Sequence, residues 1–569
     1  MEKTYRLKRS PVTKSIFLRM LTPTIFMNLT TAIGSMADTV IIGQYLDDSA
    51  LSVVTFAMPI FMIINLFAAL FAVGGCIAMS IDSGRGEKET ANKAFSLSME
   101  LMAAVSTVMF LTGLFFSGTI TKWLGAEKDV FEAVQLYSKI ILMGAPLFIF
   151  NIGFAFFVRN DGNPTLSMIG MFSSIVVDIV LNVVFVGSMG MGVAGAAYST
   201  VIGSLVSVII ISIHFLTSKN TLRFRFTFGM MALRIMKNGG SAALHFVYQF
   251  VTILIINHLL ASLAGTNGVV VYTVVFNLAT VSLSVFEGIS QTIQPMVSNY
   301  YGEESPAKTH ETLRLALLAI LVICCSVTLV LELFPQIVPI LFRIDDTALI
   351  QNSAVAVRIY AVSMVITTIN VVLGYYLQST EENFTAAVFI SLRCLILFLG
   401  FTLLLGLLFG MNGIWAAYTA AEVLSTLICI LMLWYKQRKL KQKNIRASLL
   451  LLDEDARSQT ECYTFCCKAG DYDSFTKAVC TQLAQRQDLD EALYSEASRY
   501  LAVLAQCCIN KSGKYVEVEI PGKTTKIIIR DNLDHSTCKD SLSDPISPEI
   551  KADYGPVLGW NRICLERGT

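Results

Sequence analysis

Charged residues are scarce in this sequence. Only 15% of its 569 residues are Asp, Glu, Lys or Arg and 54% are hydrophobic, whereas a soluble domain carries about 25% charge. The composition therefore excludes an ordinary soluble protein and indicates a polytopic membrane protein. The net charge of +1 shows no basic excess, so no nucleic-acid partner is expected.

Several sequence motifs are missing as well. The thirteen cysteines include no pair in CxxC spacing, so we expect no metal site. The segment PGKTTK lacks the earlier glycine of a phosphate-binding loop, which argues against an ATP-driven enzyme. The basic N-terminal stretch precedes a long apolar segment without a small-residue cleavage site, which predicts a retained first helix and no signal peptide.

Apolar windows of membrane-spanning length recur twelve times along the chain. Basic residues crowd the loops before the first window and after windows two, six, eight and twelve, whereas the opposite loops are acidic. The positive-inside rule therefore places both termini in the cytoplasm. We expect a multi-pass protein of the plasma (inner) membrane, in contact with membrane lipids, with helices near 16–42, 53–80, 94–118, 135–158, 165–187, 192–216, 239–264, 268–296, 312–334, 353–378, 385–408 and 411–435.

The chain also repeats itself. IDSGRGEKETANKAF after the second helix is similar to SNYYGEESPAKTHET after the eighth, and GVAGAAYST in the sixth is similar to GMNGIWAAY in the twelfth. Because six is an even number, both halves enter the membrane from the same side, which predicts parallel repeats with a binding cavity between them. The expected fold is all-α, with six-helix lobes at 1–218 and 239–440 and a cytoplasmic linker at 219–238.

The first spanning segment carries Asp38 in the middle of its apolar run. A carboxylate in hydrocarbon persists only with a partner, a proton or an ion, which makes Asp38 a candidate functional residue. Burial favours the neutral form of a carboxylate and a nearby cation favours the charged form, so a proton and a cationic substrate would compete for Asp38. Competition at a site that faces alternate sides of the membrane is antiport. The alternative is a carboxylate that is hydrogen-bonded within its helix for packing alone.

Further polar residues lie inside other predicted helices. Asp178 and Asn182 are four residues apart in the fifth helix and share a face. We group both with Asp38 and with Asn151 of the fourth helix as a polar cluster of the first lobe. In the second lobe, Glu287 lies well inside the eighth helix and is the strongest candidate for another titrating carboxylate.

Other residues have less specific roles. Arg159 leads into the run DGNP, whose residue types favour a tight turn, so we interpret it as a structural corner with a possible gating contact. Glu422 lies close to a predicted helix end, from which it would reach the membrane interface. Flexible and aromatic side chains suit unlike ligands, and the candidates for lining a substrate cavity are Asn28, Met58, Tyr248, Gln249 and Tyr272.

Three segments together resemble the multidrug and toxic compound extrusion (MATE) family: MADTVIIGQYLDDSALSVVTFAMP, RNDGNP and GMGVAGAAYST. The resemblance covers residues 15–440. It implies a twelve-helix secondary antiporter, not an enzyme and without a cofactor, that exports organic, often cationic, small molecules in exchange for protons or sodium ions. Asp38 matches the acidic residue of the family's first helix.

This sequence also departs from the family. A related subgroup has Asn first and Asp one turn later in the fifth helix, whereas here Asp178 precedes Asn182, which moves the charge by about 5.4 Å. The acidic residues that sodium-coupled members place in helices seven and ten are missing. Coupling is therefore expected to centre on Asp38 in the first lobe.

Two alternative functions stay open from the sequence. A lipid-linked saccharide flippase shares the wider superfamily architecture, but it would have a strongly cationic cavity, and few basic residues lie within the spans beyond Arg358 and Arg393. A transporter-like membrane sensor that signals through its C-terminal domain is the other alternative.

The composition changes beyond Arg446. A linker at 441–460 leads into 461–569, whose pattern predicts a small cytoplasmic α/β domain with strands near 463–468, 515–520, 526–530 and 561–566 and helices near 472–485 and 489–509. This domain, which ends in YGPVLGWNRICLER, resembles the histidine-kinase-like ATPase fold in its anti-sigma-factor form. The resemblance would place Asn510 at the magnesium-binding position and Asp531 at the adenine-binding position. Gln506 stands where that family has a glutamate base, which favours a degenerate regulatory domain with a cytoplasmic protein partner.

Overall fold

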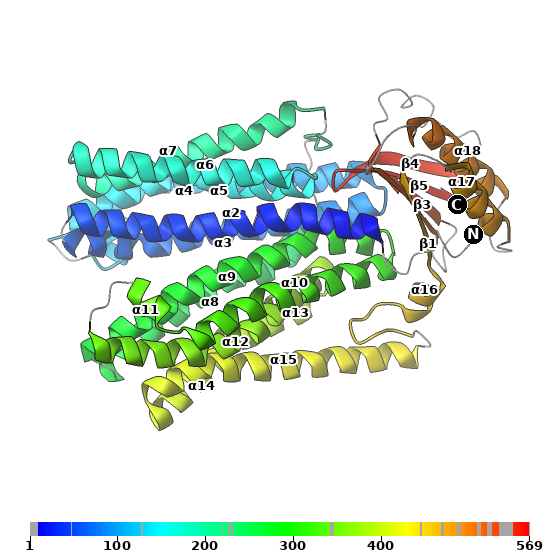
Figure 1. Ribbon diagram of the computed structural model, residues 1–569. Helices are drawn as coiled ribbons and strands as arrows, with labels where there is room; N and C mark the ends of the chain where they lie inside the picture. Colours follow the sequence, from blue (N-terminus) through cyan, green and yellow to red (C-terminus); the bar gives the residue numbers. More distant parts are fainter. Residues whose placement is uncertain are drawn as a thin grey trace.

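A bundle of long helices carries a small α/β domain at one end (Figure 1). We call that end of the bundle the tail-side end and residues 446–567 the tail. The computed structural model describes residues 10–46, 48–126, 129–218, 220–225, 229, 231–263, 265–341, 346–443, 446–467, 472–485, 491–508, 514–520, 526–533 and 550–567.

The first lobe consists of six long helices. The fifth continues into a π-helical turn and the sixth into a 3₁₀ turn. The first helix begins where Ser10 caps the amide of Thr13 and Pro11 takes the first helical position. The elements are α2 (Pro11–Tyr45), α3 (Asp48–Gly84), α4 (Lys88–Trp123), α5 (Phe131–Asn160), α6 (Pro164–Asn182) followed by η1 (Val183–Ser188), and α7 (Gly192–Ser212) followed by η2 (Ile213–Leu216).

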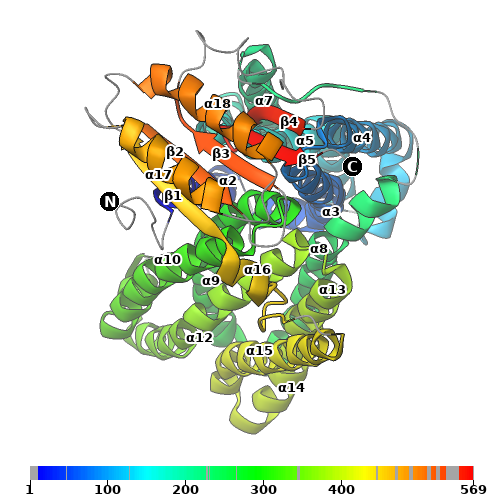
Figure 2. The ribbon, with the colours of Figure 1, turned by 90° about the vertical axis from the view of Figure 1, so that its right-hand side faces the viewer.

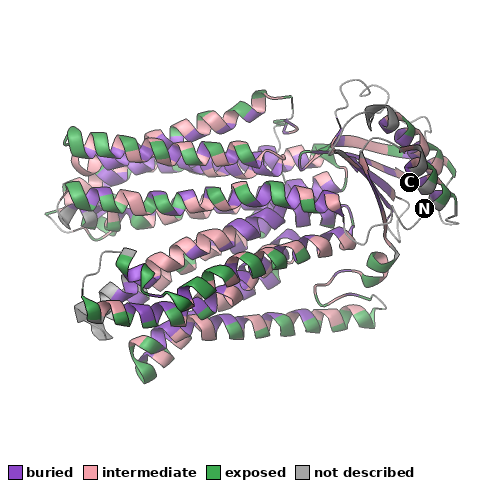
Figure 3. Ribbon diagram, in the orientation of Figure 1, coloured by how far each residue is buried: buried purple, intermediate pink, exposed green. Residues whose placement is uncertain are grey.

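The second lobe follows the same plan. Its elements are α8 (Met231–Leu263), α9 (Gly265–Gly302), α10 (Pro306–Leu333), α11 (Ile337–Leu341), α12 (Thr347–Ser379), α13 (Asn383–Ser391), η3 (Leu392–Ile396), α14 (Leu397–Phe409) and α15 (Met411–Gln442). Within the described residues, eleven helices are long and apolar enough to cross a membrane, and the one predicted span that is not among them, 239–264, is covered by α8. The outward faces of the helices carry exposed residues (Figure 3), among them the large apolar Leu321, Leu404 and Leu407, as expected for a multi-pass membrane protein.

The two lobes touch along α3, which packs against α8 and α9. At the tail-side end this contact is backbone to backbone. A Cβ atom on Gly84 would lie 2.2 Å from the carbonyl oxygen of Asn299, and one on Gly302 would lie 2.1 Å from that of Ile81. Only glycine permits such an approach. Helices α3 and α9 are the second long helices of their lobes, and the glycine at the end of each one lies against the backbone of the other. This contact closes the lobes against each other at the tail-side end.

The tail contains one five-stranded antiparallel sheet in the order β1-β2-β3-β5-β4. Helices α17 and α18 cover one face of it (Figure 2). The strands β1, β2, β3 and β5 and both helices lie where the sequence predicts them, and β4 was not predicted. The elements are α16 (Glu454–Gln459), β1 (Glu461–Cys467), α17 (Tyr472–Gln485), α18 (Glu491–Cys508), β2 (Lys514–Ile520), β3 (Lys526–Asp531), β4 (Ile550–Val557) and β5 (Trp560–Arg567).

The two faces of this sheet differ in chemistry because side chains alternate along each strand. On β2, Val516 and Val518 pack into the apolar core beneath the two helices. Glu517 and Glu519 point the other way, toward the transmembrane body, and are fully buried. The sheet therefore has no free face, since its charged side is covered by the helix bundle.

Candidate functional site

Two acidic residues meet inside the first lobe. The side chains of Asp38 on α2 and Asp178 on α6 lie close enough to interact with each other directly. Asn182, one turn beyond Asp178, donates its Nδ2 to Oδ1 of Asp38 at 3.1 Å. Ser199 and Thr200 of α7 lie beside Asp178, and their hydroxyls donate to the carbonyl oxygen of Ala196. Two carboxylates this close in a medium of low dielectric are stable together only if a proton or a cation lies between them. The pair is therefore a candidate ion-binding site.

The prediction that Asn151 belongs to this cluster is wrong. A different residue of α5, Tyr137, lies close enough to interact electrostatically with both carboxylates. Asn151 is about four turns further along the same helix, roughly 21 Å away along its axis. Asn151 is buried, and its Oδ1 has no hydrogen-bond partner within the described part of the chain. Tyr137 gave no signal in the sequence because a tyrosine in an apolar helix is usually a packing residue.

A cavity of about 310 Å³ lies between the lobes. The elements that line it are α2, α3, α5 and α6 of the first lobe and α8, α9, α12, α13 and η3 of the second. Its polar lining includes Asn28 and Glu287, both predicted, together with His245, Gln291 and Arg393. The Asp38 and Asp178 pair is not part of this lining, so the candidate ion site and the central cavity are separate places in the fold.

Gln291 joins the lobes at the cavity wall. It exchanges hydrogen bonds with Asn28 at 3.3 Å and accepts one from Nη1 of Arg159 at 2.7 Å. The guanidinium of Arg159 also lies over the ring of Phe156, 4.5 Å from its centroid. The predicted corner after Arg159 is a tight turn, and Arg159 itself bonds from the first lobe to Gln291 of the second. The sequence contained one signal for Gln291, since it follows Glu287 by four residues on the same helix face.

A second cavity of about 360 Å³ adjoins the first inside the second lobe. The two share His245, Glu287 and Arg393 in their linings. Gln249 and Tyr272 line the second cavity, as predicted. Met58 and Tyr248 lie outside both cavities, which corrects two predictions. Met58 is 48% exposed, and the hydroxyl of Tyr248 is bonded to Ser391 at 2.7 Å.

The prediction for Glu422 was also wrong. It is buried within the second lobe instead of reaching the interface. Both of its carboxylate oxygens accept hydrogen bonds from Nε of Arg393 at 2.8 Å, and Asn370 donates to the same carboxylate at 2.6 Å. The partners lie on different helices, so no local pattern in the sequence pointed to the pair. Arg393 therefore brings little net charge to the cavities that it lines.

Of the two predicted nucleotide-binding residues of the tail, the structure describes one. Asn510 lies outside the described residues. Asp531 is buried at the end of β3, where Oδ1 accepts hydrogen bonds from the backbone amide of Leu533 at 2.8 Å and from Asn561 at 2.9 Å.

The fold and the two repeats were compared with known proteins. A model of the MatE family matches residues 23–184 and 241–404, one stretch in each lobe and together more than half of the chain. The chain belongs to the MatE family. This confirms the resemblance found in the sequence. Membership of a family of transporters also agrees with the prediction that the protein is not an enzyme.

Relatives of this MatE protein include the multidrug export protein MepA of Staphylococcus saprophyticus, 23% identical over 446 residues that cover 77% of this chain and 97% of the relative. MepA of Staphylococcus haemolyticus is 25% identical over 435 residues, which cover 75% and 95%. Because these relatives are aligned over nearly their whole length, about a quarter of this chain has no counterpart in them. The tail lies beyond residue 404, where the family match ends.

Solved structures share the fold of the body. A crystal structure of MATE in complex with MaL6 superimposes with a TM-score of 0.71 at 22% identity, over 76% of this chain and 97% of that one. The outward-facing conformation of a multidrug resistance MATE family transporter gives the same TM-score at 21% identity and the same coverage. A MOP superfamily transporter from Pyrococcus furiosus, described for the reverse polarity of its binding pocket, gives 0.68 at 22% identity.

Proposed function

We propose that this MatE protein is a secondary antiporter that exports organic cations across the plasma (inner) membrane in exchange for protons or sodium ions. The observation that carries the proposal is the contact between Asp38 and Asp178 inside the first lobe. An ionisable residue within a spanning helix is costly and is retained for ion or proton movement. Two such residues in contact form a site that must exchange a proton or a cation whenever its surroundings change.

The coupling step follows from the charges at this site. When the pair holds one proton or one cation, its charge is reduced and the first lobe can rearrange. When the ion leaves to one side, the carboxylates repel each other and a new ion must enter. Further oxygen atoms nearby are Oδ1 of Asn182, which has no hydrogen-bond partner among the described residues, and the hydroxyls of Ser199 and Thr200. Such a set suits a sodium ion as well as a proton, so both coupling ions remain part of the proposal.

The chemistry of the cavities supports an organic cation as substrate. Glu287 lines both cavities, and aromatic side chains including Phe246 and Tyr272 supply apolar contacts. Among the described residues that line either cavity, Arg393 is the one Arg or Lys, and Glu422 offsets its charge. A lipid-linked saccharide carries phosphate and would need a cationic cavity, so this lining favours export of cations over a flippase.

The orientation is also part of the proposal. Arg85, Lys88, Lys308 and Arg314 all lie at the tail-side end of the bundle, and the positive-inside rule assigns that end to the cytoplasm. The tail would then be cytoplasmic, and the apolar outward faces of the helices would contact lipid. The names of the MepA relatives, which describe multidrug export, agree with transport out of the cell.

Uptake of a fluorescent organic cation into inverted vesicles tests the proposal, with proton and sodium gradients imposed separately. Asp38→Asn should abolish the stimulation by whichever gradient drives the wild type. Asp129→Asn is the matched control, because Asp129 is an exposed carboxylate in the loop before α5. Gradient-driven uptake by Asp38→Asn at the rate of the control would refute the proposed coupling site.

A second candidate function, a transporter-like sensor, draws support from the contacts of the tail with both lobes. It predicts that deletion of residues 450–569 leaves export intact and removes an effect on gene expression. Loss of export without any change in gene expression would count against the sensor.

A further inference from the structure

The tail contacts the body at two loops that are repeats of one another. One is the α3 to α4 loop of the first lobe with the adjoining helix ends, residues 84–88, and the other is the α9 to α10 loop of the second lobe with the first turn of α10, residues 302–308. These loops belong to the segments whose similarity revealed the internal repeat. A single copy of the tail therefore binds both halves of a duplicated structure.

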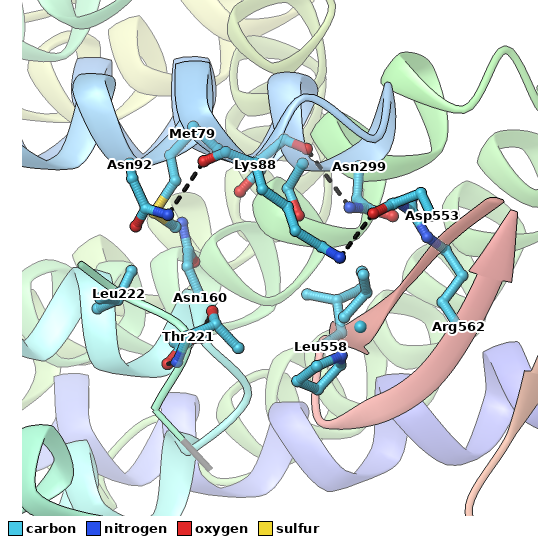
Figure 4. Close-up of a pocket in the computed structure, with 17 residues that line it drawn as sticks. Met79, Lys88, Asn92, Asn160, Thr221, Leu222, Asn299, Asp553, Leu558 and Arg562 are labelled. Carbon is cyan, nitrogen blue, oxygen red and sulfur yellow. Dashed lines mark hydrogen bonds and ion pairs between the residues drawn. The ribbon is translucent and has the colours of Figure 1, made fainter. Parts of the chain in front are cut away.

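Arg562 on β5 touches both loops with one guanidinium group. Its Nη1 donates to the carbonyl oxygen of Gly84 at 3.0 Å and to Oε1 of Glu303 at 3.1 Å. Its Nη2 donates to Asp553 of β4 at 2.6 Å, and Asp553 pairs with Lys88 of the first lobe at 2.6 Å. Figure 4 shows Lys88, Asp553 and Arg562 in this arrangement.

Glu517 on β2 forms a second bridge between the lobes. Its carboxylate accepts hydrogen bonds from Ser10, at the start of α2, and from Lys308 of the second lobe. Lys308 also donates to the hydroxyl of Ser10 at 2.7 Å. Nearby, Glu303 accepts a bond from Arg530 of β3 in addition to the one from Arg562. The charged face of the sheet is thus hydrogen-bonded to groups from both lobes.

Most of these contacts are buried, although the side chain of Lys88 is half exposed. The exposed fractions of Glu303, Lys308, Glu517 and Arg562 do not exceed 3%. If the tail-side ends of the lobes moved apart while the tail stayed on the second lobe, the buried charged groups of Arg562 and Glu517 would lose their hydrogen-bond partners in the first lobe, Gly84 and Ser10, and the loss of a buried bond to a charged group is costly. Surface ion pairs would not have this effect, because water would replace the lost partner.

The β4 to β5 hairpin makes further contacts with the body, in addition to those of Arg562 and Glu517. Its turn has two residues of positive φ, Leu558 and Gly559, and Leu558 packs among the buried apolar residues at the start of α2. Arg19 of α2 donates to the carbonyl oxygen of Leu558 at 2.8 Å. The hairpin lines the pocket of Figure 4 together with Asn160 of the first lobe and Asn299 of the second. It therefore lies across the junction between the lobes.

We propose that the tail is a lock on the transport cycle. While docked, it holds the tail-side ends of the two lobes together and keeps the central cavity closed toward the tail. The inference rests on the proposed transport function, in which lobes related by an axis along the membrane normal must rock apart at that end to load substrate. An anchoring domain would need contacts with one lobe, whereas this tail joins both. The cycle therefore requires release of the tail from at least one of the repeated loops.

The test measures the separation of the tail-side ends in the full chain. Donor and acceptor fluorophores replace the exposed Glu89 on α4 and Arg314 on α10, and energy transfer reports their distance. Arg562→Gln removes the contacts with both lobes, and Glu303→Gln removes the shared acceptor from the body side. Arg499→Gln is the matched control, since Arg499 pairs with Glu496 within α18 of the tail.

Both Arg562→Gln and Glu303→Gln should raise the ratio of separated to closed molecules by about tenfold, within the usual range of coupling between sites. Arg499→Gln should leave it unchanged. Agreement between a tail-side and a body-side variant excludes misfolding of the tail as the cause. A distance distribution that stays at the wild-type value in both variants overturns the lock.

Transport of the fluorescent cation in the same variants separates the lock from the proposed function. If the lobes separate and export accelerates, both are supported. If the lobes separate but no organic cation moves in any variant, the lock stands and the substrate assignment fails. If export accelerates without any change in separation, the lock is overturned and the transport function stands.

Discussion

Asn182 of α6 donates a hydrogen bond to Asp38 of α2 at 3.1 Å, one turn beyond the Asp178 carboxylate that also contacts Asp38. We expect Asp178→Asn to reduce gradient-driven uptake at least about tenfold, as we also expect of Asp38→Asn, because groups that act as a unit fail together. Vesicle uptake measures this, with Asp129→Asn as control. Uptake by Asp178→Asn within about twofold of the wild type would show that Asp178 has a packing role only.

Glu287 should determine the affinity for positively charged substrates. Glu287→Gln is expected to weaken binding of an organic cation about tenfold, since a lost bond to a charged group is worth about 1.5 kcal/mol or more. Binding of a neutral analogue of the same shape should not change. Equilibrium binding to purified protein measures both, and Glu332→Gln, whose residue lines neither cavity, is the control. Equal losses for cation and neutral analogue would contradict a charge contact.

The buried pair of Arg393 and Glu422 should matter for stability more than for recognition. Glu422→Gln leaves a buried guanidinium without its counter-charge, which is expected to cost about 3–5 kcal/mol. Replacing both residues by leucine should cost less, because no charge is left unpaired. Thermal unfolding in detergent measures the difference. A double variant that is less stable than Glu422→Gln would show that the cost of the single substitution does not come from an unpaired guanidinium.

Docking of the tail should weaken in acid through Glu517. Burial alone would raise the pKa of Glu517, but Lys308 and Arg530 outweigh it and hold the pKa below its usual range. A lowered pKa stabilises the docked state at pH values above the ordinary glutamate pKa of about 4.3, and this contribution is lost as the pH falls through the lower docked value.

Energy transfer between the tail and the body, followed from pH 7 into acid, measures this effect. Glu517→Gln should dock more weakly than the wild type at neutral pH and lose less on acidification. Glu303, Glu519 and Asp553 are present in both proteins, so the difference between the two curves isolates Glu517. Parallel curves would contradict a contribution from this residue.

The sequence predicted the helices and most strands because their patterns are local. A long apolar run identifies a span, and alternation of Val516 and Val518 with charged neighbours identifies a strand. Strand β4 was missed because IKADYGPV contains Gly555 and Pro556 and has no clear alternation. In the site, Asp38, Asp178 and Asn182 could be grouped because two of them share a helix face and all are costly in a membrane.

The remaining features depend on partners far away in the chain. The charged side of the tail sheet has the pattern of a face exposed to water, and nothing local shows that the body covers it. Glu422 likewise finds Arg393 on another helix. The sequence prediction put Asn151 in the Asp38 cluster because it could not judge how far along its helix Asn151 lies relative to Asp38. A sequence shows which residues share a helix face more clearly than it shows the register between neighbouring helices.

The bond from Arg562 to Gly84 joins residues 478 positions apart in the chain. Loop closure over such a separation is slow and comes late in folding. During synthesis both lobes are translated before β5. They can therefore insert and pack before Arg562 is present to join them. A newly made molecule would therefore pass through an unrestrained period, and docking of the tail would mark the completion of its maturation.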